Sequence, residues 1–169
     1  MRITASIATT AANTTKKAAS LRASEASRSS LRMWGSPMAL KKGFKQLVDE
    51  AEAEIETISV EDAKQLVDDE NTVIVDLRDI RELWNSGTIP GSVHAPRGML
   101  EFWVDPDSPY HRDVFSSGKK LVFFCAAGWR SALATKAVQD MGVAPVAHIG
   151  GGFGAWTEAD GPVEAKEKK

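Results

Sequence analysis

The chain has 169 residues, of which 43% are hydrophobic, so it is long enough to bury the core of one domain. Residues 1–36 hold six of the 21 basic residues and one of the 23 acidic residues, so the rest of the chain is acidic and lacks a basic stripe, which argues against a nucleic-acid partner. A single cysteine excludes an internal disulfide and argues against a cysteine-based zinc site, and no apolar stretch is long enough to cross a membrane.

Composition divides the chain into four segments. Residues 1–36 are rich in Ala, Ser and Thr and poor in large apolar groups, so they cannot fold alone. They are either a disordered extension or a mitochondrial transit peptide, which has this Arg- and Ser-bearing, acid-poor composition. The first alternative predicts a cytoplasmic protein and the second a mitochondrial one. Beyond them we expect an N-terminal helix within 37–55, a folded domain over 56–163 and a charged tail over 164–169.

The first half of the chain after residue 36 alternates between helix and strand signals. The predicted elements are a helix over 39–53, an extended segment over 54–57, a helix over 59–69, a strand over 72–75, a helix over 79–86 and a short strand over 92–94. Ser59, followed three residues later by Asp62, has the spacing of a capping box. The β-branched run Thr72–Val75 predicts a buried strand that delivers Asp76 and Arg78 at its carboxyl end.

The second half continues the alternation. The predicted elements are a loop over 96–118 with a helical turn near 99–103, a strand over 120–124, a helix over 131–141, a strand over 146–149 and a short helix after Gly150–Gly152. The apolar run Lys120–Phe124 is typical of a central parallel strand, and it ends at Cys125. The alternation predicts an α/β fold with an open, mainly parallel sheet and helices on both faces.

Cys125–Ser131 lies between a predicted buried strand and a predicted helix, which is where ligands bind in open α/β sheets. Backbone N–H groups of this loop, together with the positive end of the helix, favour the nucleophilic thiolate. Gly128 allows a tight turn, and Arg130 either braces the loop or binds an anionic substrate. A lone cysteine after an apolar strand is more often a small buried hydrophobe, but the Gly-x-Arg-Ser that follows favours a reactive cysteine.

The loop Cys-x-x-Gly-x-Arg-Ser resembles the active-site loop of the single-domain rhodaneses, and further family motifs occur in the same order. They are Asp76-Leu77-Arg78, Glu82-Leu83-Trp84, Gly87 to Ser92, His94, Pro96, Gly150 to Gly152, Ala155-Trp156 and Gly161-Pro162. The resemblance spans Glu56–Val163 and implies a three-layer fold around a five-stranded sheet. It also implies a sulfurtransferase of the thiosulfate:cyanide type, without a metal or another cofactor, in which Cys125 becomes a persulfide and passes its sulfur to cyanide or a thiol.

The resemblance assigns roles to individual residues. The active-site loop then consists of Cys125, Ala126, Ala127, Gly128, Trp129, Arg130 and Ser131. Its amides hold the persulfide, and Arg130 assists an anionic donor. Asp76 and Arg78 tie the strand end to neighbouring loops, and His94 is expected near the site as a structural group. His111 and His148 show no spacing that indicates a metal or base role.

Two other functions stay open. The chain could be a persulfide carrier or interaction module that takes sulfur from a sulfur-relay protein and turns over small donors poorly. It could also be a phosphatase or arsenate reductase of the same fold, although those enzymes use Cys-x5-Arg, whereas Cys125 to Arg130 forms a tighter Cys-x4-Arg loop. Ala126 and Ala127 replace the basic residues of the best-known thiosulfate-using loops, which puts thiosulfate in doubt as the donor.

Overall fold

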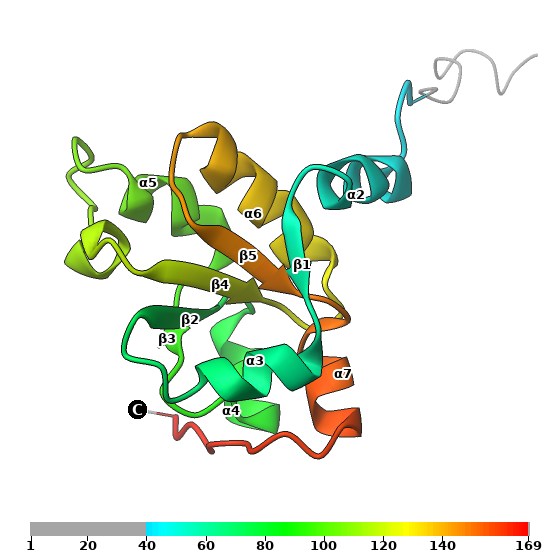
Figure 1. Cartoon of the computed structure of the whole chain (residues 1–169), viewed down its shortest axis with the longest axis vertical. Coiled ribbons are helices and arrows are strands. Elements are labelled where there is room, and N and C mark those ends of the chain that lie inside the picture. Colours follow the sequence, from blue (N-terminus) through cyan, green and yellow to red (C-terminus); the bar gives the residue numbers. More distant parts are fainter. Residues whose placement is uncertain (1–39, 169) are drawn as a thin grey trace, which may run out of the picture. The chain divides into compact units, whose positions relative to one another are not determined.

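The computed structural model describes residues 40–168, so the segment 1–36 lies outside the described residues. Within the described residues, 42–168 form one compact unit, and its elements are labelled in Figure 1. The helices are α2 (Phe44–Glu52), α3 (Val60–Leu66), α4 (Ile80–Ser86), α5 (Leu100–Val104), α6 (Trp129–Asp140) and α7 (Gly152–Glu158), with the short 3-10 helices η2 (Arg97–Met99) and η3 (Asp113–Ser116). The strands are β1 (Glu56–Ile58), β2 (Thr72–Asp76), β3 (Val93–His94), β4 (Lys120–Phe124) and β5 (Val146–Ile149).

The five strands form one sheet in the order β1-β5-β4-β2-β3, and every neighbouring pair is parallel. The predicted α/β class and five-stranded sheet are therefore confirmed. Because all five strands point the same way, their carboxyl ends share one edge of the sheet, and ligands bind at this edge in such folds. Cys125 follows the carboxyl end of the central strand β4.

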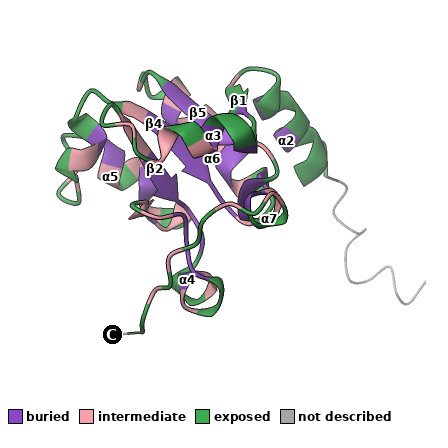
Figure 2. Ribbon diagram, turned by 60° about the horizontal axis from the view of Figure 1, so that its bottom comes forward, coloured by how far each residue is buried: buried purple, intermediate pink, exposed green. Residues whose placement is uncertain are grey.

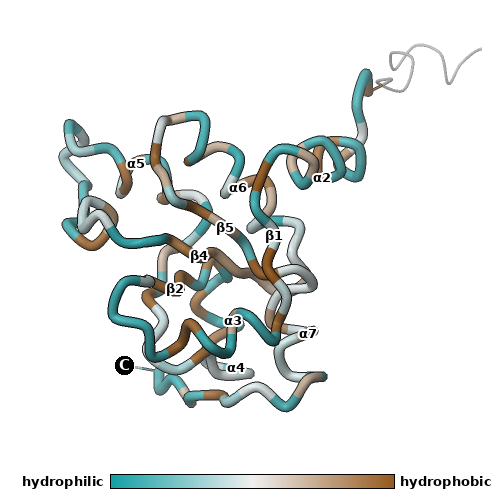
Figure 3. The backbone as a smooth tube through the Cα atoms, in the orientation of Figure 1, coloured by the Kyte–Doolittle hydropathy of each residue, from teal (hydrophilic) through white to brown (hydrophobic). Residues whose placement is uncertain are grey.

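The side chains of β4 alternate between two hydrophobic cores. Leu121 and Phe123 pack with residues of α5 and α6 on one face of the sheet, and Val122 and Phe124 pack with residues of α3 and α7 on the other. Figure 1 shows these helices on opposite sides of the sheet, Figure 2 shows the strands buried between them, and Figure 3 shows hydrophobic residues along the central strands. Burial of each phenylalanine contributes about 1.5–3 kcal/mol, so the position of β4 is strongly specified.

The predicted helix at 59–69 is shorter in the structure, and local side chains explain both of its ends. The Ser59 hydroxyl accepts the N–H of Asp62 and begins α3 as expected. The helix ends at Leu66, before Asp69, whose carboxylate accepts a hydrogen bond from the Thr72 hydroxyl over 2.7 Å. Asp69 therefore stabilises the turn into β2 and does not extend the helix.

Other element boundaries also differ from the prediction. α6 begins at Trp129, two residues before the predicted start, because Gly128 precedes it with φ of 92° and turns the chain directly into the helix. α2 begins at Phe44, after the extended residue Gly43, so residues 40–43 of the predicted helix are not helical. The loop expected over 96–118 contains α5 and two short 3-10 helices. Within 40–168, no helix is both long and apolar enough to cross a membrane.

Candidate functional site around Cys125

Cys125 lies at the junction between β4 and the loop that leads into α6. Its side chain alternates with Phe124, so it joins the core on the α6 face, and only 1% of the residue is exposed. The Ser131 hydroxyl donates a hydrogen bond to the Cys125 sulfur Sγ, with 3.6 Å between the two atoms. The sulfur is thus surrounded mainly by apolar groups and faces one hydroxyl.

The loop after Cys125 carries a set of backbone donors that have no acceptor in the described part of the chain. Among residues 40–168, the N–H groups of Ala126–Ser131 form no hydrogen bond, and the first helical bond runs from the Ala132 N–H to the Gly128 carbonyl over 2.9 Å. Such unpaired N–H groups at the start of a helix form a partly positive, anion-binding turn. The Cys125 sulfur receives none of them in this arrangement, so the role of these amides in holding a second sulfur atom stays a prediction.

The carbonyl groups of the same loop are held by the turn that follows β5. The N–H of Phe153 donates to the Cys125 carbonyl over 2.7 Å, and the N–H of Gly154 donates to the Ala126 carbonyl over 2.9 Å. Gly152, with φ of 61°, approaches so closely that a Cβ there would lie 2.3 Å from the Cys125 carbonyl oxygen. Because the C=O and N–H of one peptide unit point in opposite directions, these bonds also fix where the first loop amides point.

Arg130 makes a bidentate ion pair with Glu82 of α4. The guanidinium atoms Nη1 and Nη2 lie 2.8 and 2.9 Å from the two carboxylate oxygens. This hydrogen bonding lowers the pKa of Glu82 and is the largest cause of the raised pKa of Arg130, to which the nearby Cys125 adds a smaller contribution. The structure shows a contact by which Arg130 braces the loop against α4, and the binding of an anionic substrate by Arg130 stays a prediction. The Glu82 carboxylate offsets the positive charge beside the sulfur.

Asp76 and Arg78 form a buried ion pair at the end of β2. Arg78 Nη2 lies 2.7 Å from Asp76 Oδ2 and also donates to the Gly87 carbonyl, while the Thr88 hydroxyl donates to the same Asp76 oxygen. His94 Nε2 lies 2.8 Å from the Arg78 carbonyl oxygen. These contacts join the strand end to the turn after α4, so the three supporting residues have structural partners.

His148 of β5 is a functional candidate that the sequence reasoning missed. It is fully buried, with Nδ1 3.2 Å from the Ser131 hydroxyl oxygen and Nε2 2.9 Å from the Thr57 hydroxyl oxygen. Burial lowers the pKa of His148 to about 4, so the ring is neutral near pH 7. The signal available in the sequence was a histidine inside an apolar strand, where a buried polar side chain must find partners.

Aromatic side chains cover the surface beside the loop. Trp129 is 55% exposed, and its ring lies 5.1 Å, between centroids, from the ring of Phe44 on α2. Ala127 is also exposed. The surface around the loop is therefore largely apolar, with the Arg130 and Glu82 pair as its nearby charged groups.

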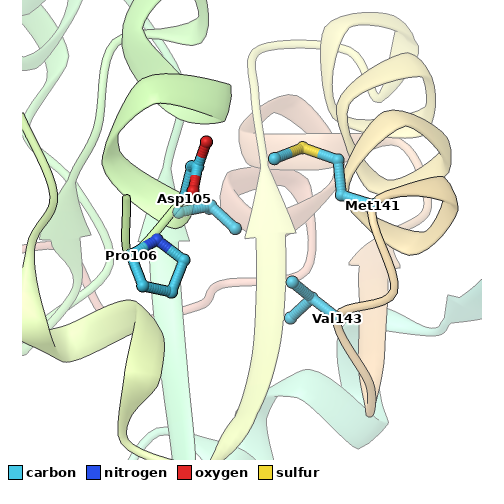
Figure 4. A pocket seen from close by; sticks show the side chains of 5 residues that line it. Asp105, Pro106, Met141 and Val143 are labelled. Atoms are coloured by element: carbon cyan, nitrogen blue, oxygen red, sulfur yellow. The ribbon is translucent and has the colours of Figure 1, made fainter. Parts of the chain in front are cut away.

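Cavities also occur away from Cys125. One of about 310 Å³ is lined by Val104, Asp105, Pro106, Met141 and Val143, and Figure 4 shows four of these residues labelled. Because Met141 and Val143 precede β5, this cavity lies at the amino ends of the strands, at the opposite edge of the sheet from Cys125. Within residues 40–168 there is no cluster of three or more His, Cys, Asp or Glu residues suited to a metal ion.

Comparison with known proteins gives a family match and several relatives. The family model of the rhodanese-like domain matches residues 59–159. A solved structure from Rhodopseudomonas palustris, a protein of unknown function described as a possible tyrosine phosphatase, is 54% identical with a TM-score of 0.74, and the match covers 77% of this chain and all of that one.

Two further relatives are connected with sulfur. The polysulfide-sulfur transferase of Wolinella succinogenes is 28% identical with a TM-score of 0.56, and the match covers 73% of this chain and 88% of that one. A protein of Bacillus subtilis named as a candidate sulfur carrier is 31% identical over 70% of this chain. The match spans 59% of the length of the Bacillus protein.

Proposed function

Since this chain belongs to the rhodanese-like domain family, we propose that it is a sulfurtransferase in which Cys125 carries a sulfane sulfur as a persulfide. The observation that carries the proposal is the set of N–H groups over Ala126–Ser131 that have no acceptor within residues 40–168. A persulfide places a second sulfur about 2 Å from Sγ, and its negative charge needs donors because the surrounding core is apolar. The loop amides supply such donors next to Cys125.

The reaction consists of two displacements at sulfur. The Cys125 thiolate attacks the outer sulfur of a donor such as thiosulfate, a bond forms between Sγ and that sulfur, and the S–S bond of the donor breaks so that sulfite leaves. Cyanide or a thiolate then attacks the outer sulfur, the bond to Sγ breaks, and the Cys125 thiolate is restored. Each step conserves charge and needs no external oxidant or reductant.

The charges around the loop favour a donor with a single negative charge. Arg130 is the charged side chain of the loop, and its pairing with Glu82 offsets that charge. Ala126 and Ala127 contribute no charge to the loop. A doubly charged thiosulfate ion therefore gains little Coulomb attraction here, and we expect a small persulfide anion to donate its sulfur more efficiently.

Thiocyanate release tests this proposal. The full chain is incubated with cyanide and either thiosulfate or the persulfide of 2-mercaptoethanol, which is small and carries a single negative charge, and thiocyanate is measured above the uncatalysed background. We expect turnover with both donors, faster with the persulfide, and none with Cys125→Ser. His111→Gln serves as the matched control, because His111 bonds to Ser116 on η3 and not to the loop. Undiminished turnover by Cys125→Ser refutes the mechanism.

A persulfide carrier is the second candidate, and the resemblance to the Bacillus protein favours it. A carrier needs the same stabilised persulfide on Cys125 but receives its sulfur from a partner protein. Protein isolated from cells would then carry one extra sulfur on Cys125, while turnover with both small donors would be negligible. That combination of results would identify the protein as a persulfide carrier.

A phosphatase is the third candidate, because the Rhodopseudomonas protein is described as a possible one. Two features oppose it. The Cys-x4-Arg loop is one residue shorter than the Cys-x5-Arg loop of phosphatases built on this fold, and the Arg130 guanidinium is paired with the Glu82 carboxylate, which would repel an oxyanion. Hydrolysis of an aryl phosphate that depends on Cys125 would overturn this reasoning.

A further inference from the structure

A row of hydrogen-bonding groups leads from the Cys125 sulfur to an exposed residue. The Ser131 hydroxyl oxygen lies 3.6 Å from Sγ and 3.2 Å from His148 Nδ1. The other ring nitrogen, Nε2, lies 2.9 Å from the Thr57 hydroxyl oxygen. Cys125, Ser131 and His148 are buried, whereas Thr57 is exposed on β1. The row therefore connects a buried thiol with solvent.

The sheet register brings these residues together. His148 of β5 pairs with Thr57 on one side and with Phe123 of β4 on the other. Directly paired residues of neighbouring strands share a face of the sheet, and Cys125, two residues after Phe123, lies on that same face. α6 packs on this face and places Ser131 between the sulfur and the imidazole.

The tautomer of His148 determines which acceptor receives the hydrogen of the Ser131 hydroxyl. The Ser131 hydroxyl has one hydrogen but three acceptors within reach, namely Sγ, His148 Nδ1 and the Gly128 carbonyl, the last at 2.9 Å. An unprotonated Nδ1 competes for that hydrogen. A protonated Nδ1 donates to the Ser131 oxygen instead and leaves the hydrogen available to the sulfur.

We propose that His148 is a positioning residue that acts through Ser131, so that its tautomer changes when Cys125 ionises and the thiol proton leaves toward Thr57. The inference rests on the proposed function, since Cys125 must ionise to attack a sulfur donor. In the thiol form, Sγ donates to Ser131, Ser131 donates to His148 Nδ1, and His148 Nε2 donates to Thr57.

Ionisation moves one proton along each link of the row. The thiol proton passes to the Ser131 oxygen, the Ser131 proton passes to His148 Nδ1, the Nε2 proton passes to the Thr57 oxygen, and Thr57 releases its own proton to water. One proton leaves the protein and the thiolate holds the negative charge. His148 remains neutral, with its hydrogen moved from Nε2 to Nδ1, and the Ser131 hydroxyl now donates to the thiolate.

The surroundings of the row suit a neutral relay. Burial disfavours the imidazolium form of His148, so the ring exchanges tautomers and does not hold a charge. Most charged groups on the elements around the row occur as ion pairs, which are Glu56 with Lys120, Asp76 with Arg78, Glu82 with Arg130, Lys136 with Glu54 and Asp140, Lys45 with Asp49, and Glu50 with Lys42. Glu52 of α2 has no ion pair within residues 40–168, and it is exposed to solvent, which screens its charge.

Nitrogen-15 NMR of the histidine rings tests the coupling directly. The full chain, labelled at histidine, is titrated from the pH where Cys125 is a thiol to the pH where its alkylation rate by iodoacetamide has reached a plateau. We expect the His148 hydrogen to move from Nε2 to Nδ1 over that range in the wild type and to stay in place in Cys125→Ser. A tautomer that is the same at both ends of the wild-type titration overturns the proposal.

Alkylation kinetics provide a second test. Ser131→Ala removes the hydroxyl that donates to the thiolate in the ionised form and interrupts the row between the sulfur and the imidazole. We expect this variant to lower the alkylation rate of Cys125 at neutral pH by about fivefold, with the difference disappearing at the high-pH plateau, because the thiolate loses a hydrogen-bond donor. We also expect the His148 tautomer of this variant to stay the same over the titration. A wild-type pH profile and a wild-type tautomer change in Ser131→Ala contradict the relay.

These measurements separate the relay from sulfur transfer, because neither uses a sulfur donor. A tautomer change in a protein that forms no thiocyanate leaves the relay in place and removes the proposed function. An unchanged tautomer in a protein that transfers sulfur refutes the relay and leaves the proposed function in place.

Discussion

Protonation of His148 should make the domain less stable in mild acid. Burial lowers the pKa of this histidine from 6.5 to about 4, so the unfolded chain binds a proton at a higher pH than the folded one does. Stability is therefore complete above the unfolded pKa and is lost as the pH falls toward the folded value. Each pKa unit corresponds to about 1.4 kcal/mol, which gives a loss of about 2 kcal/mol between about pH 7.5 and about pH 5.

Comparison with His148→Asn isolates this contribution. The free energy of unfolding is measured by urea titration at both pH values for the two proteins, so that contributions of the other titratable groups cancel in the difference. We expect the wild type to lose about 2 kcal/mol more than the variant as the pH falls, even if the variant is less stable at the higher pH. Equal losses in both proteins would refute the claim that the fold holds His148 neutral.

Three further substitutions follow from the contacts around the loop. Arg78→Met leaves the buried Asp76 carboxylate without its cationic partner and should lower the free energy of unfolding by about 3–5 kcal/mol, measured in urea. Gly152→Ala places a Cβ 2.3 Å from a carbonyl oxygen of the active-site loop at positive φ, so it should destabilise the domain by more than about 1 kcal/mol in the same assay. Glu82→Gln should lower the KM for thiosulfate, because Arg130 then keeps its full positive charge beside the loop.

The parts of the fold that depend on residues close together along the chain could be predicted from the sequence. The run Lys120–Phe124 is apolar at every position after its first residue, which fits a central strand covered on both faces, and the structure has β4 there. Ser59 and Asp62 have capping-box spacing, and α3 begins directly after Ser59. The position of Cys125 at a strand end follows from the same local pattern.

The parts of the site that depend on distant contacts could not be predicted in this way. Ser131 and Thr57 lie 17 and 91 residues from His148 along the chain, and they meet it only through the packing of α6 and the pairing of β1 with β5. Arg130 likewise finds Glu82 across 48 residues. A loop motif indicates the candidate cysteine, whereas the groups that contact its neighbours depend on the register of the sheet.

The central claim is that Cys125 forms a persulfide, and intact-mass analysis measures this directly. The intact mass of the purified full chain is measured before and after exposure to glutathione persulfide, and again after cyanide is added. We expect the wild type to gain one sulfur atom and to lose it to cyanide, and Cys125→Ser to gain none. A wild-type mass that does not change, or an equal gain by Cys125→Ser, would contradict the claim.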